Sequence, residues 1–106
     1  MNLKQHIIGE DGEIAMVRIP QTKIMDGKKM VSTIEVEADV YRVLREVLVA
    51  TPNNNADEAE LKYDLFLKIK DADEVEFTAK EKKIILEILP SKFDTIFAGQ
   101  VIKMLK

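Results

Sequence analysis

Apolar residues in the first third of the chain come in short runs that Gly-containing turns interrupt, without a sustained helical period. The first two runs flank a five-residue connection, residues 9–13, whose glycines can adopt the positive φ that hairpin loops require. The next two flank Asp26-Gly27, a dipeptide that favours a two-residue type I′ turn. The pattern therefore predicts antiparallel hairpins, with about three to four strands, over residues 1–37.

The last of these strands shows the alternation of a half-buried sheet. Apolar and polar side chains alternate along residues 32–37, which predicts one buried face and one face in water. Pro20 lacks a backbone donor, so we expect it between the hairpins or at an exposed edge. The pattern leaves open whether the hairpins pack on the rest of the chain or extend from it.

From residue 39 onward, apolar residues recur at the helical spacing of three and four. Asp39 is placed to cap a helix that ends before Pro52. The apolar stripe of this helix is Val40, Val43, Leu44, Val47 and Leu48. Asn55 and Glu58 have the spacing of a capping box, which predicts a second helix over about residues 56–70.

Two further helices are expected near the C-terminus. Thr78 and Glu81 form a capping box for a helix that should close at Pro90. Ser91 begins a Ser-x-x-acid cap for a helix that reaches the last residues. Gly99 lies inside that helix at a cost of roughly 1 kcal/mol relative to Ala, which suggests that a neighbouring backbone approaches closely there.

Length and composition favour one α+β domain. The chain has 106 residues, of which 46% are apolar and 33% charged, enough for one core. We expect a single domain over residues 1–106, with a hairpin-rich part at 1–37 and about four short helices in residues 38–106. The net charge of −3 gives no long-range attraction to phosphate or anionic lipid. The absence of Cys excludes disulfides, zinc thiolate sites, iron–sulfur clusters and a cysteine nucleophile.

Sequence features of membrane insertion and secretion are missing. No apolar run approaches the eighteen or more residues that span a bilayer. Acidic residues follow the N-terminus before any signal-peptide core can form. We therefore expect a cytoplasmic protein without a membrane partner.

The residues offer little for catalysis. His6 is the only histidine, and the two serines, Ser32 and Ser91, lie outside any nucleophile elbow. The acidic cluster at residues 71–76 lacks the order of a calcium loop, and the four glycines are scattered rather than grouped as a phosphate cradle. We predict a protein that is not an enzyme, with no catalytic, cofactor-binding or metal-binding residues and no evident small-molecule substrate. An enzyme would need a metal held by carboxylates together with His6.

Nucleic-acid binding is an alternative carried by one cluster. Lys80, Lys82 and Lys83 lie at the start of a predicted helix, where they could contact phosphates. Acidic residues interleave with them, which favours an ordinary solvated helix face. A helix-turn-helix in the last two helices would leave only Gln100 and Lys103 to read bases.

Protein binding is the preferred class. The helices of the second half are apolar over more than one narrow stripe, and a short chain has limited interior in which to bury them. The alternative is that four helices close a single core. Our candidate partner-binding residues are Leu61, Phe66, Phe93, Phe97 and Met104.

The second half also has a recognisable order of elements. An aliphatic helix precedes the acidic-Val-Glu-aromatic-Thr run at residues 73–79, and a second aliphatic helix and a final helix with Gly99-Gln100-Val101 follow. Over residues 61–106 this order resembles small uncharacterised proteins of tailed bacteriophages and prophages. The resemblance implies a source, and a location in the cytoplasm of a bacterial host, but no catalytic residue. Residues 1–37 lie outside it and would serve as an arm for a partner or for self-assembly.

The sequence thus predicts a non-enzymatic, phage-type interaction or assembly protein. We expect it to form homo-oligomers through its hairpins, by strand addition, or through exposed apolar helix faces. The alternative is a small regulatory protein associated with nucleic acid.

Overall fold

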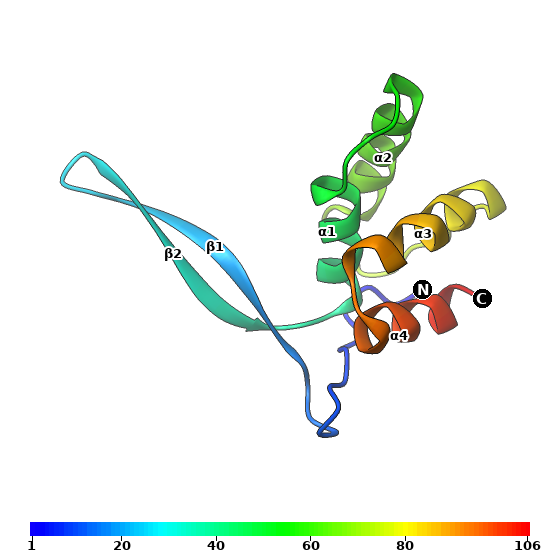
Figure 1. The fold of residues 1–106 in the computed structure, drawn as a ribbon, viewed down its shortest axis with the longest axis horizontal. Coiled ribbons are helices and arrows are strands. Elements are labelled where there is room, and N and C mark those ends of the chain that lie inside the picture. The colour runs from blue at the N-terminus through cyan, green and yellow to red at the C-terminus, as the bar shows by residue number, and fades with distance from the viewer.

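A computed structural model describes all 106 residues as one two-stranded antiparallel sheet followed by four helices, which confirms the α+β class. The elements are β1 (Met16–Met25), β2 (Lys28–Glu37), α1 (Val40–Ala50), α2 (Ala56–Ile69), α3 (Ala79–Lys92) and α4 (Thr95–Leu105). The helices gather into a body, and the hairpin of β1 and β2 projects from it (Figure 1). We call this hairpin, residues 16–37, the arm and the rest of the chain the body. The arm contributes to a longest dimension of 49 Å.

The Asp26-Gly27 turn forms as predicted. Both residues have positive φ, 52° and 74°, as a type I′ turn requires. The register runs without a bulge from Met25 opposite Lys28 to Met16 opposite Glu37. Pro20 lies within β1, and because both strands of a two-stranded sheet are edges, it occupies the exposed edge that the sequence predicts.

The prediction of three to four strands is wrong, since the structure has two. The connection at residues 9–13 forms a turn, but only Ile8 and Ile14 pair across it. Leu3 and Ile7 are fully buried, and their N–H groups bond to the carbonyls of Asp73 and Ala38 in the body. Single backbone contacts to loops of the body therefore replace the ladder of a third strand.

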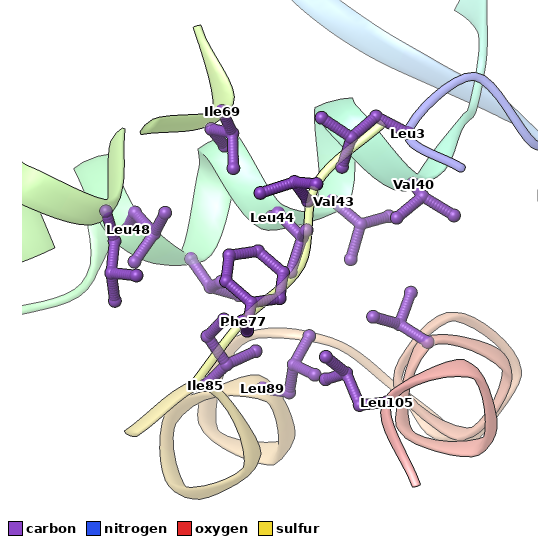
Figure 2. Close-up of a cluster of buried hydrophobic side chains, with 14 of the residues drawn as sticks. Leu3, Val40, Val43, Leu44, Leu48, Ile69, Phe77, Ile85, Leu89 and Leu105 are labelled. Carbon is purple, nitrogen blue, oxygen red and sulfur yellow. The ribbon is translucent and has the colours of Figure 1, made fainter. Parts of the chain in front are cut away.

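The core lies between α1, the other helices and the N-terminal segment (Figure 2). All five residues of the predicted α1 stripe are buried. Around them pack Leu3, Ile7, Leu65, Ile69, Val75, Phe77, Ile85, Leu89, Val101 and Leu105. Helix α1 thus serves as the centre of the body because its apolar face is wide and continuous.

Two details near the C-terminus differ from the sequence prediction. Helix α3 continues past Pro90 to Lys92, and Asp94 rather than Ser91 caps α4, accepting hydrogen bonds from the N–H groups of Ile96 and Phe97. The Ser91 hydroxyl instead donates to the Ile88 carbonyl (2.6 Å) within α3.

The environment of Gly99 also differs from expectation. A Cβ atom built at this position meets no atom within 4 Å, so the expected close approach of a backbone is wrong. None of the four helices combines the length and the apolar character needed to cross a membrane.

Candidate binding surfaces

The outer half of the arm exposes large apolar side chains on both faces. Ile24 and Val31 are 74% and 72% exposed on one face. Met25 and Met30 are more than half exposed on the other. The predicted buried face of the second strand is thus wrong over most of its length, because no element of the body covers it. A two-stranded hairpin without such cover is of marginal stability in water.

Cover is found only at the base of the arm. Val17 pairs with Val36 on the face toward the body, and both are half-buried. Ile19 is half-buried as well, opposite Ile34, which is 38% exposed. Of these four residues only Val17 packs against the core cluster, so the body covers the arm at its first residues and leaves the outer half free.

Charge separates the outer arm from the rest of the chain. Between residues 20 and 33 the charged side chains are Lys23, Lys28 and Lys29 against Asp26, a net charge of +2. None of these lysines has an ion-pair partner. With the whole chain at −3, the remaining residues carry −5. The outer arm is therefore a basic and apolar surface on an acidic protein.

A surface that is acidic and apolar, and so complementary in charge to the outer arm, lies on α2. Asp57, Glu60, Tyr63, Asp64 and Leu67 follow the i, i+3, i+4, i+7 spacing of one helix face, and all are exposed. Tyr63 and Leu67 are 60% and 48% exposed. None of the three carboxylates has an ion-pair partner. We call these five residues the α2 face.

A groove of about 530 Å³ separates the base of the arm from the body. Its walls are β1 and the outer side of α1, and it ends at the junction of α3 and α4. At that junction Phe93 and Phe97 stack with ring centroids 5.6 Å apart. The groove combines an open strand edge, cations of α1 and an aromatic pair.

The structure separates the five candidate partner-binding residues. Phe93 and Phe97 lie together in this groove, whereas Leu61 lies in another groove between α2 and α3. Phe66 and Met104 are half-buried against the core from α2 and α4. Sequence reasoning missed Ile24, Val31 and the α2 face; their alternating and helical spacings are readable in the sequence, but their exposure depends on tertiary packing.

The lysines of the nucleic-acid alternative lie in the first turns of α3. Lys80 and Lys83 are exposed and Lys82 is half-buried. Gln100 is not free to read bases, because its side-chain amide accepts from the Ile8 N–H (2.9 Å) and donates to the carbonyls of Ile8 and Ile96. Gln100 thus ties the N-terminal segment to α4.

His6 and the acidic loop meet at a shallow depression. His6 lies 3.8 Å from Glu37, and Asp39, Asp71 and Asp73 line the same depression. No three His, Asp or Glu side chains of the chain are arranged to hold a metal ion.

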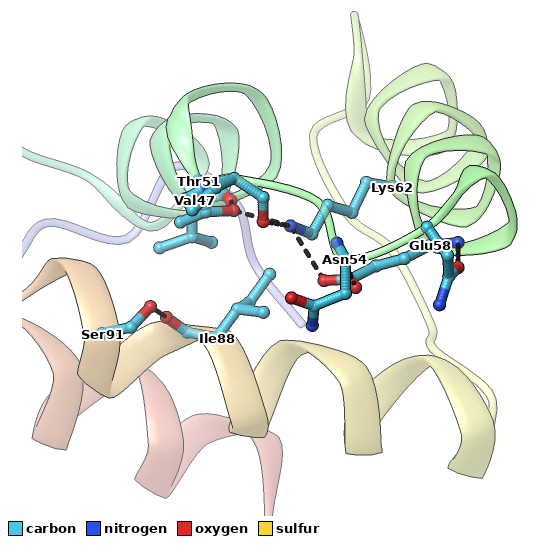
Figure 3. Close-up of polar contacts among 9 residues, drawn as sticks. Val47, Thr51, Asn54, Glu58, Lys62, Ile88 and Ser91 are labelled. Carbon is cyan, nitrogen blue, oxygen red and sulfur yellow. Dashed lines mark hydrogen bonds and ion pairs between the residues drawn. The ribbon is translucent and has the colours of Figure 1, made fainter.

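Lys62 is the one buried charged residue, with 2% of its side chain exposed. Its ammonium donates to the Thr51 hydroxyl (2.9 Å) and the Pro52 carbonyl (3.0 Å) and pairs with Glu58 (3.2 Å); Figure 3 shows Lys62 between Thr51 and Glu58. The Asn54 N–H and the Lys62 ammonium hold the pKa of Glu58 below its ordinary value. Every donor of Lys62 is used, so this cluster locks α1 to α2 rather than awaiting a ligand.

No protein-family model, curated protein or solved structure matches this chain.

Proposed function

We propose that this protein is a non-enzymatic assembly protein, of the phage or prophage type, that self-associates through its arm. The observation that carries the proposal is the exposed outer arm, which presents apolar side chains on both faces. Burying such a surface under a partner removes apolar area from water and lowers the free energy.

The partner we propose is the α2 face of a second copy. The outer arm brings three unpaired lysines and four exposed apolar residues, and the α2 face brings three unpaired carboxylates with Tyr63 and Leu67. Opposite charges around an apolar centre favour one orientation and disfavour contact of arm with arm. Exposed ion pairs are worth about 0.2–1 kcal/mol each, so apolar burial supplies affinity and the charges supply register.

A charge-exchange experiment tests this pairing. One variant reverses the arm (Lys23→Glu, Lys28→Glu, Lys29→Glu) and the other reverses the α2 face (Asp57→Lys, Glu60→Lys, Asp64→Lys). Each variant alone should be monomeric by light scattering, because its arm and α2 face then carry the same sign. An equimolar mixture should associate, since each arm then meets an α2 face of opposite sign.

The mixture distinguishes pairing from general charge effects. Association of either variant alone at the wild-type level would contradict the α2 face as the partner, and so would a mixture that stays monomeric. Circular dichroism of each variant checks that the body stays folded. A nucleic-acid function would appear instead as salt-dependent binding of oligonucleotides that Lys80→Ala, Lys82→Ala and Lys83→Ala weaken.

A further inference from the structure

We propose that the groove at the base of the arm binds an acidic, extended peptide segment of another polypeptide, which adds as a third strand to the outer edge of β1. This site is separate from the surfaces of the proposed self-association. It would make the protein an adaptor between its own assembly and a second protein.

The strand edge in the groove has free backbone groups. The Ala38 N–H bonds to the Ala15 carbonyl (2.8 Å), and pairing alternates along an antiparallel hairpin. Met16 and Arg18 therefore turn their N–H and C=O groups away from β2, and both residues line the groove. Pro20 has no N–H to offer, so an added strand is limited to the base of the arm.

Unpaired cations in the groove favour an acidic ligand, because the two carboxylates of the groove are engaged: Glu46 pairs with Lys92 and Asp94 caps α4. Arg42 and Arg45 on α1 line the groove, and neither has an ion-pair partner. The other two cations of the groove are already paired: Arg18 with Glu35 (3.3 Å) and Lys92 with Glu46 (3.6 Å). Two free guanidiniums beside a strand edge match carboxylates on alternate residues of an added strand.

The apolar part of the groove indicates which residues the peptide carries besides its acidic ones. Phe93 and Phe97 end the groove, and Val17 and Ile19 contribute half-buried aliphatic surface from β1. The side chains of an added strand that point toward the body, on the face of Val17 and Ile19, would meet the guanidiniums and this apolar surface together, so we expect acidic residues and an aromatic residue at alternate positions of the peptide.

A peptide fits these features better than a nucleic acid does. The backbone groups of an open strand edge pair with a peptide backbone, which nucleic acids lack. The net charge of −3 also repels a long polyanion, whereas two or three carboxylates interact only locally.

The test measures the affinity of a labelled nonapeptide, capped at both ends, that alternates glutamate with threonine and has phenylalanine in place of the central glutamate, so that the acidic and aromatic side chains share one face. Fluorescence anisotropy against the full chain should show saturable binding. The variant Arg42→Glu with Arg45→Glu should lose about tenfold or more in affinity. The matched control, Lys80→Glu with Lys83→Glu, makes the same change in net charge on α3 and should stay within about twofold.

A second peptide examines the mode of binding. Replacement of its central phenylalanine by proline removes a backbone donor and should also cost about tenfold. An equal loss in both protein variants, no saturation by about 1 mM peptide, or tighter binding of oligothymidine through Arg42 and Arg45 would each overturn the proposal. Because the arm-reversed variant retains the groove, unchanged peptide affinity in that variant separates this site from self-association.

Discussion

The body and the arm differ in how they treat apolar side chains: the body buries a large cluster of them, whereas the arm leaves them exposed. In the body, apolar side chains of the four helices, the N-terminal segment and two connecting segments form one cluster of 17 buried residues. Its buried side-chain nitrogen and oxygen atoms all have hydrogen-bond partners. In the arm, no residue is buried, and the most exposed large apolar side chains of the molecule, Ile24 and Val31, lie near its tip.

This difference indicates that the body supplies the stability of the fold and the arm supplies the surface for association. The free energy of folding resides in the body, which holds the buried apolar cluster and whose buried polar side chains are hydrogen-bonded. The arm gains stability only through its base and through a partner. Substitutions in the body should therefore change the free energy of unfolding, and those in the outer arm should change association.

The largest effect is expected for Leu44→Ala in α1. Leu44 is fully buried at the centre of the body, so the cavity should lower the free energy of unfolding by about 2–5 kcal/mol. The matched arm substitution, Ile24→Ala, should cost less than about 0.5 kcal/mol in the monomer. Urea denaturation at low protein concentration compares the two, and an equal loss would contradict the division of tasks.

Removing the buried ammonium should have the next largest effect. Lys62→Met keeps the aliphatic stem but leaves the Thr51 hydroxyl, the Pro52 carbonyl and Glu58 without their cation. We expect a loss of about 1–3 kcal/mol in the free energy of unfolding. Lys83→Met, at an exposed position without an ion pair, is the control and should be close to neutral.

A gain of stability is expected from Gly99→Ala in α4. The position is helical and the new methyl group meets open space, so the substitution removes only the entropic cost of glycine. The free energy of unfolding should rise by about 0.5–1 kcal/mol. A decrease, measured by thermal denaturation, would mean that α4 packs more tightly at this position than the structure shows.

The smallest effect concerns pH. Burial raises the pKa of Glu81, but hydrogen bonds from Lys68 and the Thr78 N–H outweigh it, so the pKa lies below its ordinary value of 4.5. Glu81 therefore contributes stability above pH 4.5 that is lost as the pH falls through its lowered folded-state pKa. Glu81→Gln should flatten the fall of the melting temperature between pH 7 and 3, whereas the exposed Glu87→Gln should not.

Local patterns predicted the fold wherever neighbouring residues decide it. The five-residue stripe of α1 and the Asp26-Gly27 turn follow from spacing and backbone preference. The number of strands does not follow from local patterns, because the N–H groups of Leu3 and Ile7 bond to carbonyls of loops distant in sequence and their side chains join the core cluster. The cap of α4 lies at Asp94 because α3 continues past Pro90 to Lys92, although Pro90 has no N–H to donate to the carbonyl one turn earlier.

The candidate surfaces depended more on tertiary structure. Phe93 and Phe97 were named from their apolar character, but their position beside Arg42 and Arg45 follows from how the arm leaves the body. Exposure of Tyr63 could not be read from the helical period, since the same residue would suit a helix covered on two sides.

The most direct test is the molar mass in solution of the full chain and of a chain with a shortened arm. Replacing residues 18–35 with Asn-Gly joins Val17 to Val36, a cross-strand pair in the same register as the pair that closes the natural turn. We expect an oligomer for the full chain and a monomer of nearly unchanged melting temperature for the shortened chain. A monomeric full chain, or a shortened chain that still associates, would contradict it.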